Sequence, residues 1–141
     1  MSETGTTSGT SNAPSAGRGR AANLALWALQ VLLAVMFAMA GLSKVFGDQA
    51  MVEMFATIGV GQWFRYVVGA LEIAGAVGVL IPRLSGLAAL GLVCLMAGAT
   101  VTNLFVLGAS PFLPLLLLAV GAVVAWGRRS RTRALLSGHA R

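Results

Sequence analysis

Four apolar runs, each close to the length of a membrane-spanning helix, constrain the fold of this chain more than any other feature. The runs cover residues 23–43, 66–81, 84–107 and 110–126. A helix needs about 20 apolar residues, and at least about 17, to cross the hydrocarbon core of a bilayer. The second and fourth runs are short by this measure and need flanking residues or a thinned membrane. The runs predict an all-α integral membrane protein that folds as a four-helix bundle.

The composition agrees with a lipid environment, because only 10% of the residues are charged and 57% are hydrophobic. A soluble domain is roughly one-quarter charged. The single cysteine, Cys94, excludes an internal disulfide and a paired-cysteine redox motif. The single histidine, His139, lies in the polar C-terminal tail, so two histidines cannot hold a haem. We therefore expect no redox centre, no metal and no cofactor in the chain itself, and lean against an enzyme.

The chain divides into three parts. Residues 1–20 are rich in Ser, Thr and Gly without apolar periodicity, which predicts a disordered tail. Residues 21–127 form the predicted four-helix transmembrane domain, and residues 128–141 form a basic tail. The basic tail directly follows a span, so it indicates membrane topology and not a nucleic-acid partner.

A short amphipathic segment is predicted at the membrane surface between the first two spans. Asp48 is suited to cap a helix that ends near Gly59. Four apolar residues share one face of that helix: Met51, Met54, Phe55 and Ile58. Trp63, Phe64 and Tyr66 follow, as is typical of an aromatic belt at the lipid–water boundary.

The basic residues predict the orientation. Lys44 and Arg65 lie on one side of the predicted spans. The other side carries eight arginines: Arg18, Arg20, Arg83, Arg128, Arg129, Arg131, Arg133 and Arg141. Cytoplasmic loops carry the excess of basic residues, so we expect a multi-pass membrane protein with both termini in the cytoplasm. A cleaved signal peptide ending at the sequence AMA of residues 38–40 is the alternative, but the apolar run exceeds the usual 7–15 residues.

Glu72 is the most unusual residue, because no other charge occurs in the six residues before it or the ten after it. It shares a helical face with Gly69 and Ala76, and small residues let helices approach closely. This face should therefore point into the bundle. The partner that we name is Lys44, at the outer end of the first span on the stripe of Gln30, Ala34, Phe37 and Gly41.

Two interpretations of this pair remain open. One is an ion pair that fixes packing and register; the other is a proton or ligand site facing a polar cavity. Ionisable residues inside a membrane span are functional candidates when a partner can be named, yet buried pairs also serve structure alone.

Further polar residues are secondary candidates. Gln30 can bond across helices, and Thr102 and Asn103 lie late in the third span. A stripe of small residues in that span, Gly91, Cys94, Gly98 and Thr102, predicts a helix contact surface. Cys94 in such apolar surroundings should be unreactive.

The sequences AMAGLSKVFG and VVGALEIAGAVGVLIPR resemble those of the DoxX and DoxX-like family of small four-helix membrane proteins. The resemblance covers about residues 24–126, and it implies a four-helix bundle in the bacterial cytoplasmic membrane. Gly41 and Lys44 match a G-x-x-K motif that ends the first helix. A G-x-L-E-x-x-G motif that opens the second is matched by Gly69, Leu71, Glu72 and Gly75. Relatives often carry a histidine late in the third helix, where this chain has Thr102 and Asn103, so histidine-dependent chemistry is not implied.

The resemblance implies a loose link to redox systems, since the family is named for a subunit of a thiosulfate:quinone oxidoreductase. The first functional hypothesis is a non-catalytic subunit or scaffold that docks soluble redox proteins at the bilayer, with quinone association left open. The second is a small proton-coupled transporter that uses an intramembrane carboxylate. A quinone reductase acting alone ranks last. Substrate, partner identity and oligomeric state are not determined by the sequence.

Overall fold

The computed structural model describes residues 16–138, and the regular structure of this part of the chain is entirely helical. The elements are α1 (Ala16–Val45), α2 (Gln49–Ile58), α3 (Gln62–Leu80), α4 (Ser85–Thr102), the π-helical turn η1 (Asn103–Leu107), α5 (Phe112–Gly127) and α6 (Arg129–Gly138). Helix α1 begins before the expected position near residue 23. Most of the tail expected to be disordered, and the last three residues with His139 and Arg141, lie outside the described residues.

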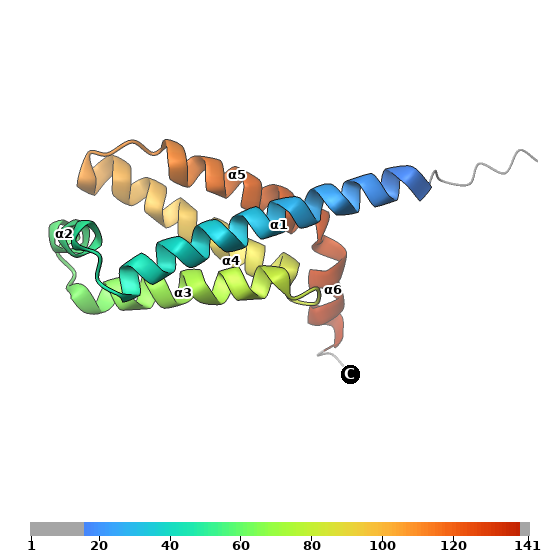
Figure 1. The fold of residues 1–141 in the computed structure, drawn as a ribbon, viewed down its shortest axis with the longest axis horizontal. Coiled ribbons are helices and arrows are strands. Elements are labelled where there is room, and N and C mark those ends of the chain that lie inside the picture. The colour runs from blue at the N-terminus through green and yellow to red at the C-terminus, as the bar shows by residue number, and fades with distance from the viewer. Residues whose placement is uncertain (1–15, 139–141) are drawn as a thin grey trace, which may run out of the picture.

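The four long helices run side by side, and the two short ones lie at opposite ends (Figure 1). Helix α1 packs most extensively against α3, and α4 packs most extensively against α5. Contacts between α3 and α4, and between α1 and α5, connect these two pairs. Helix α2 lies at the end where α1 finishes, whereas α6 lies at the end where α1 begins (Figure 1).

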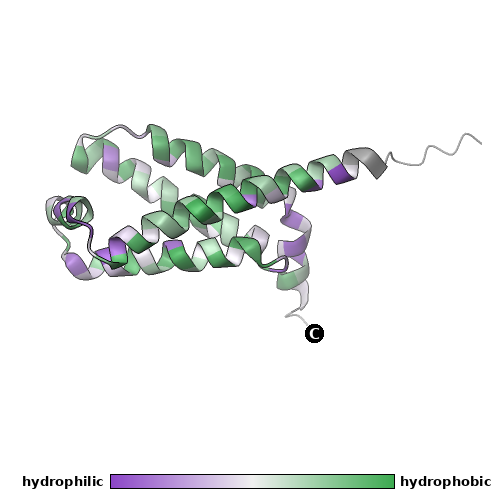
Figure 2. Cartoon of the chain, viewed as in Figure 1, coloured by the Kyte–Doolittle hydropathy of each residue, from purple (hydrophilic) through white to green (hydrophobic). Residues whose placement is uncertain are grey.

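Three helical stretches are long and apolar enough to cross a membrane: Gly19–Val45, Gln62–Leu80 and Ser85–Leu107. Helix α5 has only 16 residues, and it passes the same test together with α6, from which it is bent by 61°. The described residues therefore contain three candidate spans, or four if the bent pair counts as one. The four long helices are predominantly apolar, whereas α6 is polar (Figure 2).

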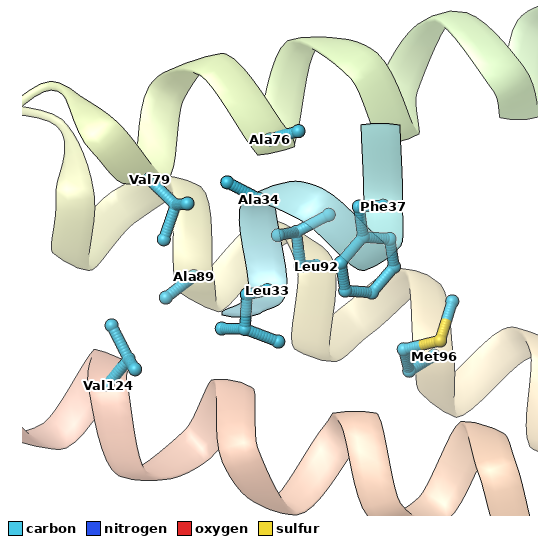
Figure 3. Packing of buried hydrophobic residues seen from close by; sticks show 9 residues of the cluster. All are labelled: Leu33, Ala34, Phe37, Ala76, Val79, Ala89, Leu92, Met96 and Val124. Atoms are coloured by element: carbon cyan, nitrogen blue, oxygen red, sulfur yellow. The ribbon is translucent and has the colours of Figure 1, made fainter. Parts of the chain in front are cut away.

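The core is a cluster of nine buried side chains between the four long helices (Figure 3). It comprises Leu33, Ala34, Phe37, Ala76, Val79, Ala89, Leu92, Met96 and Val124. Many large apolar side chains instead face outward, including Phe105, which is 81% exposed, and Phe112, which is 71% exposed. An apolar exterior of this kind suits a protein surrounded by lipid, where burial of apolar surface does not drive helix association.

Several helix boundaries follow directly from local sequence. Ile81 is extended because it precedes Pro82, which disfavours a helical conformation there. Gly59 ends α2 in the left-handed conformation that glycine adopts without strain. The Ser110 hydroxyl accepts a hydrogen bond from the Phe112 backbone at 3.3 Å, just before the start of α5, whose N-cap position is occupied by Pro111.

Asp48 occupies the position before α2, but its side chain makes no capping hydrogen bond, so the expected side-chain cap is wrong. Its backbone carbonyl instead accepts from the Met51 and Val52 amides. The apolar face expected on this helix turns inward, where Phe55 is buried and its ring meets that of Phe64 edge-on at 5.9 Å.

Candidate functional site at the crossing of α1 and α3

Two glycines bring the backbones of α1 and α3 together. A Cβ atom at Gly41 would lie 2.8 Å from the Gly69 carbonyl oxygen and 2.7 Å from the Ile73 side chain. A Cβ atom at Gly69 would lie 3.0 Å from the Gly41 carbonyl oxygen. Because backbone atoms cannot shift as flexible side chains do, only glycine fits at Gly41 without moving a helix. This close approach is typical of small residues at helix interfaces in membranes.

An ion pair lies at this crossing. The Lys44 ammonium nitrogen is 3.0 Å from Oε2 of Glu72, and the two side chains are 13% and 3% exposed, respectively. Among the described residues Oε2 has no aligned hydrogen bond, so the contact with Lys44 is chiefly electrostatic. The structure thus brings together the two residues that the sequence paired.

The stripes that carry the pair face the interior, as the sequence predicted. On α1, Gln30, Ala34 and Phe37 are buried, and Gly41 is buried one turn before Lys44. On α3, the buried residues include Gly69, Glu72, Ala76 and Val79. The alternating three- and four-residue spacing places these residues on one helical face.

Arg65 belongs to the same polar region but did not emerge as a site residue from the sequence. It is only 4% exposed, and its guanidinium donates hydrogen bonds to the Lys44 carbonyl and, at 2.9 Å, to Oε1 of Gln62. It also stacks over the Tyr66 ring at 4.3 Å. A cation here satisfies the Lys44 carbonyl, one of the last carbonyls of α1, and complements the negative end of that helix. The sequence signal that could have identified Arg65 as a site residue was its position two helical turns before Glu72, on the same helical face.

A second buried polar cluster joins α1, α3 and the junction of α5 with α6. The amide of Gln30 is fully buried and donates to the Val79 carbonyl at 2.7 Å. Its oxygen accepts from Nε of Arg128 at 2.9 Å, and Nη1 of Arg128 donates to Asn23 at 2.9 Å. Gln30 therefore bonds across helices as expected. Arg128, which is 6% exposed, was predicted only as a charge that sets orientation.

Thr102 and Asn103 do not join the Lys44–Glu72 pair by any contact within the described residues. The Thr102 hydroxyl donates to the Gly98 carbonyl of its own helix at 2.9 Å. The Asn103 amide donates to the Ser110 carbonyl at 2.9 Å, and the Asn103 carbonyl accepts from the amides of Gly108 and Ala109. Asn103 thus stabilises the turn between α4 and α5, whereas Thr102 bonds only within α4.

The predicted contact surface on α4 is wrong. Gly91, Cys94 and Gly98 are exposed, and a Cβ atom at either glycine would meet nothing within 4 Å. The buried face of α4 instead carries Ala89, Leu92 and Met96. Several small residues of α3 and α4, including Gly91 and Cys94, line an open groove of about 570 Å³ outside the bundle.

Within residues 16–138, no three His, Cys, Asp or Glu side chains gather in a way that could hold a metal ion. Most polar groups of the interior instead bond to one another or to the backbone, although Oε2 of Glu72 and Nη2 of Arg128 have no hydrogen-bond partner among the described residues. At one end of the bundle, these groups join α1 to α3. At the other end, they join α1 both to α3 and to the α5–α6 junction. The chemistry that these contacts provide is attachment of helix to helix.

Apolar helices of spanning length, joined by small residues and buried polar contacts, define a small helical membrane protein. Residues 28–127 match the model of the DoxX-like family, which is most of the chain and includes both Lys44 and Glu72. The chain belongs to the DoxX-like family. Neither the curated proteins nor the solved structures contain a match to it.

Proposed function

We propose that this chain crosses the bacterial cytoplasmic membrane four times as a helix bundle, with both termini in the cytoplasm. In this arrangement α5 is the fourth span and α6 turns onto the cytoplasmic surface after Arg128, consistent with the 61° bend. Helix α2 covers the opposite surface as an amphipathic segment. The excess of arginines near α6 supports the orientation.

Within the membrane, we assign the chain the role of a non-catalytic subunit that docks a soluble redox protein. The docked protein, and not this chain, acts on thiol, sulfur or quinone substrates. The observation that supports this role is that the buried polar groups join helices to one another. Lys44 and Glu72 meet where Gly41 and Gly69 close the crossing of α1 and α3, so the pair holds two helices together. In this proposal any redox centre belongs to the partner, and the bundle supplies a rigid membrane attachment.

A proton-coupled transporter is the second candidate, and one observation favours it. Glu72 is an intramembrane carboxylate whose Oε2 lacks an aligned hydrogen bond among the described residues. Such a group can exchange a proton if the helices separate. The larger groove has neither Lys44 nor Glu72 in its lining, so this candidate requires an opening movement at the crossing.

Co-purification from native membranes in mild detergent tests the two roles. We expect the tagged chain to recover a soluble redox protein in fixed ratio, and the Glu72→Gln variant to recover the same protein if it remains folded. An unrelated tagged four-span protein serves as the control. The isolated chain should show no flavin or haem absorption.

Either of two results would exclude the docking role. One is a stoichiometric chromophore in the isolated chain. The other is solute uptake into proteoliposomes, driven by a proton gradient, that the Glu72→Gln substitution abolishes.

A further inference from the structure

An uncompensated pair of arginines lines a cavity at the α6 end of the bundle. The cavity has a volume of about 230 Å³ and is lined by Pro82, Arg83, Arg131, Ala134 and Leu135. Arg131 is held in place because its guanidinium donates to the Pro82 carbonyl at 2.9 Å. Within residues 16–138, the Arg83 side chain has no hydrogen-bonding or ionic partner.

No carboxylate of the described residues neutralises these arginines. The described acids are Asp48, Glu53 and Glu72; the first two lie at the α2 end, and Glu72 pairs with Lys44. Guanidinium groups match the planar fork geometry of phosphate oxygens. Two arginines from different elements, one fixed and one free, therefore form a site suited to a phosphate group.

The apolar groove continues from the same turn. Leu84 follows Arg83 and lines the groove of about 570 Å³ between α3 and α4, together with Gly78, Ala88 and Gly91. The turn thus contributes consecutive residues to a basic cavity and to an apolar groove. An amphiphile with a phosphate at one end and a hydrocarbon chain at the other has the chemistry to occupy both.

We infer that the α3–α4 face binds an anionic phospholipid, with its phosphate between Arg83 and Arg131 and an acyl chain along the α3–α4 groove. The charge of the cavity favours an anionic headgroup over a zwitterionic one. The open space beside Gly91, where a Cβ atom meets nothing within 4 Å, leaves room for a chain against the helices. This binding is independent of the proposed redox role, and the membrane orientation only decides which leaflet supplies the lipid.

Native mass spectrometry of the full-length protein, with phosphatidylglycerol or phosphatidylcholine added to the detergent, tests the inference. We expect tighter binding of phosphatidylglycerol. Each arginine near an anionic lipid surface should account for about a fivefold change in affinity. Arg83→Gln should therefore weaken phosphatidylglycerol binding about fivefold, and the double variant with Arg131→Gln should weaken it further. Arg133→Gln, which removes the same charge from an exposed position outside the cavity, is the matched control and should change affinity less than twofold.

A Gly91→Leu substitution tests the apolar half. It should reduce binding of long-chain phosphatidylglycerol, while a short-chain phosphatidylglycerol stays bound. Folding of every variant is checked by its thermal denaturation. Arg83→Gln is the decisive variant because it breaks no hydrogen bond within the described residues.

Three results would overturn the inference. Equal losses for Arg83→Gln and Arg133→Gln would mean general electrostatic attraction without a site. Equal affinity for phosphatidylcholine would mean that the arginines do not select the headgroup. Displacement of the lipid by millimolar inorganic phosphate or glycerol phosphate would assign the cavity to a soluble phosphorylated ligand instead.

Discussion

The Lys44–Glu72 pair makes a quantitative prediction about the stability of the bundle. At 3.0 Å, the Coulomb attraction between two unit charges is roughly 5 kcal/mol for an effective dielectric constant of about 20. Removal of each ion from water costs several kcal/mol, so the pair as a whole should be close to neutral. Loss of one partner should instead cost about 3–5 kcal/mol, because the other charge stays buried without compensation.

The single substitutions of Lys44 and of Glu72 should differ in how much they lower the free energy of unfolding. Lys44→Met keeps the apolar stem but leaves a carboxylate that is only 3% exposed. Glu72→Gln keeps the shape but leaves an ammonium that is 13% exposed on a flexible stem, which can turn toward water. We therefore expect Lys44→Met to lower the free energy of unfolding more than Glu72→Gln does. The double variant should lose less than the sum of the two, with a coupling of about 0.5–3 kcal/mol.

Reversible unfolding in mixed micelles with added dodecyl sulfate, followed by the fluorescence of the three tryptophans, measures all four proteins. The control cycle combines Lys44→Met with Gln30→Leu, whose sites lie about 21 Å apart along α1 at 1.5 Å per residue. These two losses should add within about 0.5 kcal/mol. Strict additivity for Lys44 and Glu72 as well would refute the electrostatic reasoning and leave Glu72 to be explained by a proton or a ligand.

Three further predictions concern packing, the second polar cluster and topology. Gly41→Ala should destabilise the protein by about 2 kcal/mol or more, because its methyl group would press on a backbone carbonyl. Gly91→Ala should be neutral or stabilising by up to about 1 kcal/mol. The same unfolding assay measures both variants, and equal losses of stability would contradict the close crossing of α1 and α3. Gln30→Leu should cost about 1–3 kcal/mol because it leaves the buried Nε of Arg128 and the Val79 carbonyl without a partner. An unchanged midpoint would show that the cluster does not contribute to stability. In a cysteine-free background, membrane-impermeant thiol reagent should label a cysteine at Ser110 in intact cells and not one at Ser130, and the reverse pattern would invert the proposed orientation.

The inward face of α1 could be predicted from sequence because polar and small residues mark it. Exposing the polar side chains of Gln30 and Lys44 to lipid costs free energy, and Gly41 contributes no side chain to a lipid-facing surface. Their common stripe was therefore expected to point inward. The same reasoning located Glu72 on the buried face of α3. In both helices a few residues unsuited to lipid identify the orientation of the whole element.

The orientation of α4 could not be predicted in this way. A window of 18 residues within Ser85–Leu107 reaches a mean hydropathy of 2.0, and apolar side chains cover all sides of the helix. An entirely apolar helix carries no periodic signal for its buried face. The stripe of Gly91, Cys94 and Gly98 suggested one, but Leu92 and Met96 lie on the buried face instead.

Arg128 was missed for a different reason. Its partner Gln30 lies 98 residues earlier in the chain, and no local pattern connects them. Arginines at the end of a span are expected to face water, so the sequence favoured a topological role. Only the three-dimensional arrangement, which brings the start of α1 to the junction of α5 and α6, makes this arginine part of the interior.

The two polar clusters together explain how a bundle with little hydrophobic driving force obtains a defined register. Apolar contacts alone allow α1 to slide along its neighbours at little cost, since lipid is as apolar as the helix surfaces. Lys44 fixes α1 against α3 near the end of α1, and Gln30 fixes the middle of α1 against α3 and Arg128. A shift by one helical turn, about 5.4 Å, would break both sets of contacts and strand charged groups in apolar surroundings. If the pair serves packing alone, the cost of misplacing Glu72 favours a single alignment of the helices.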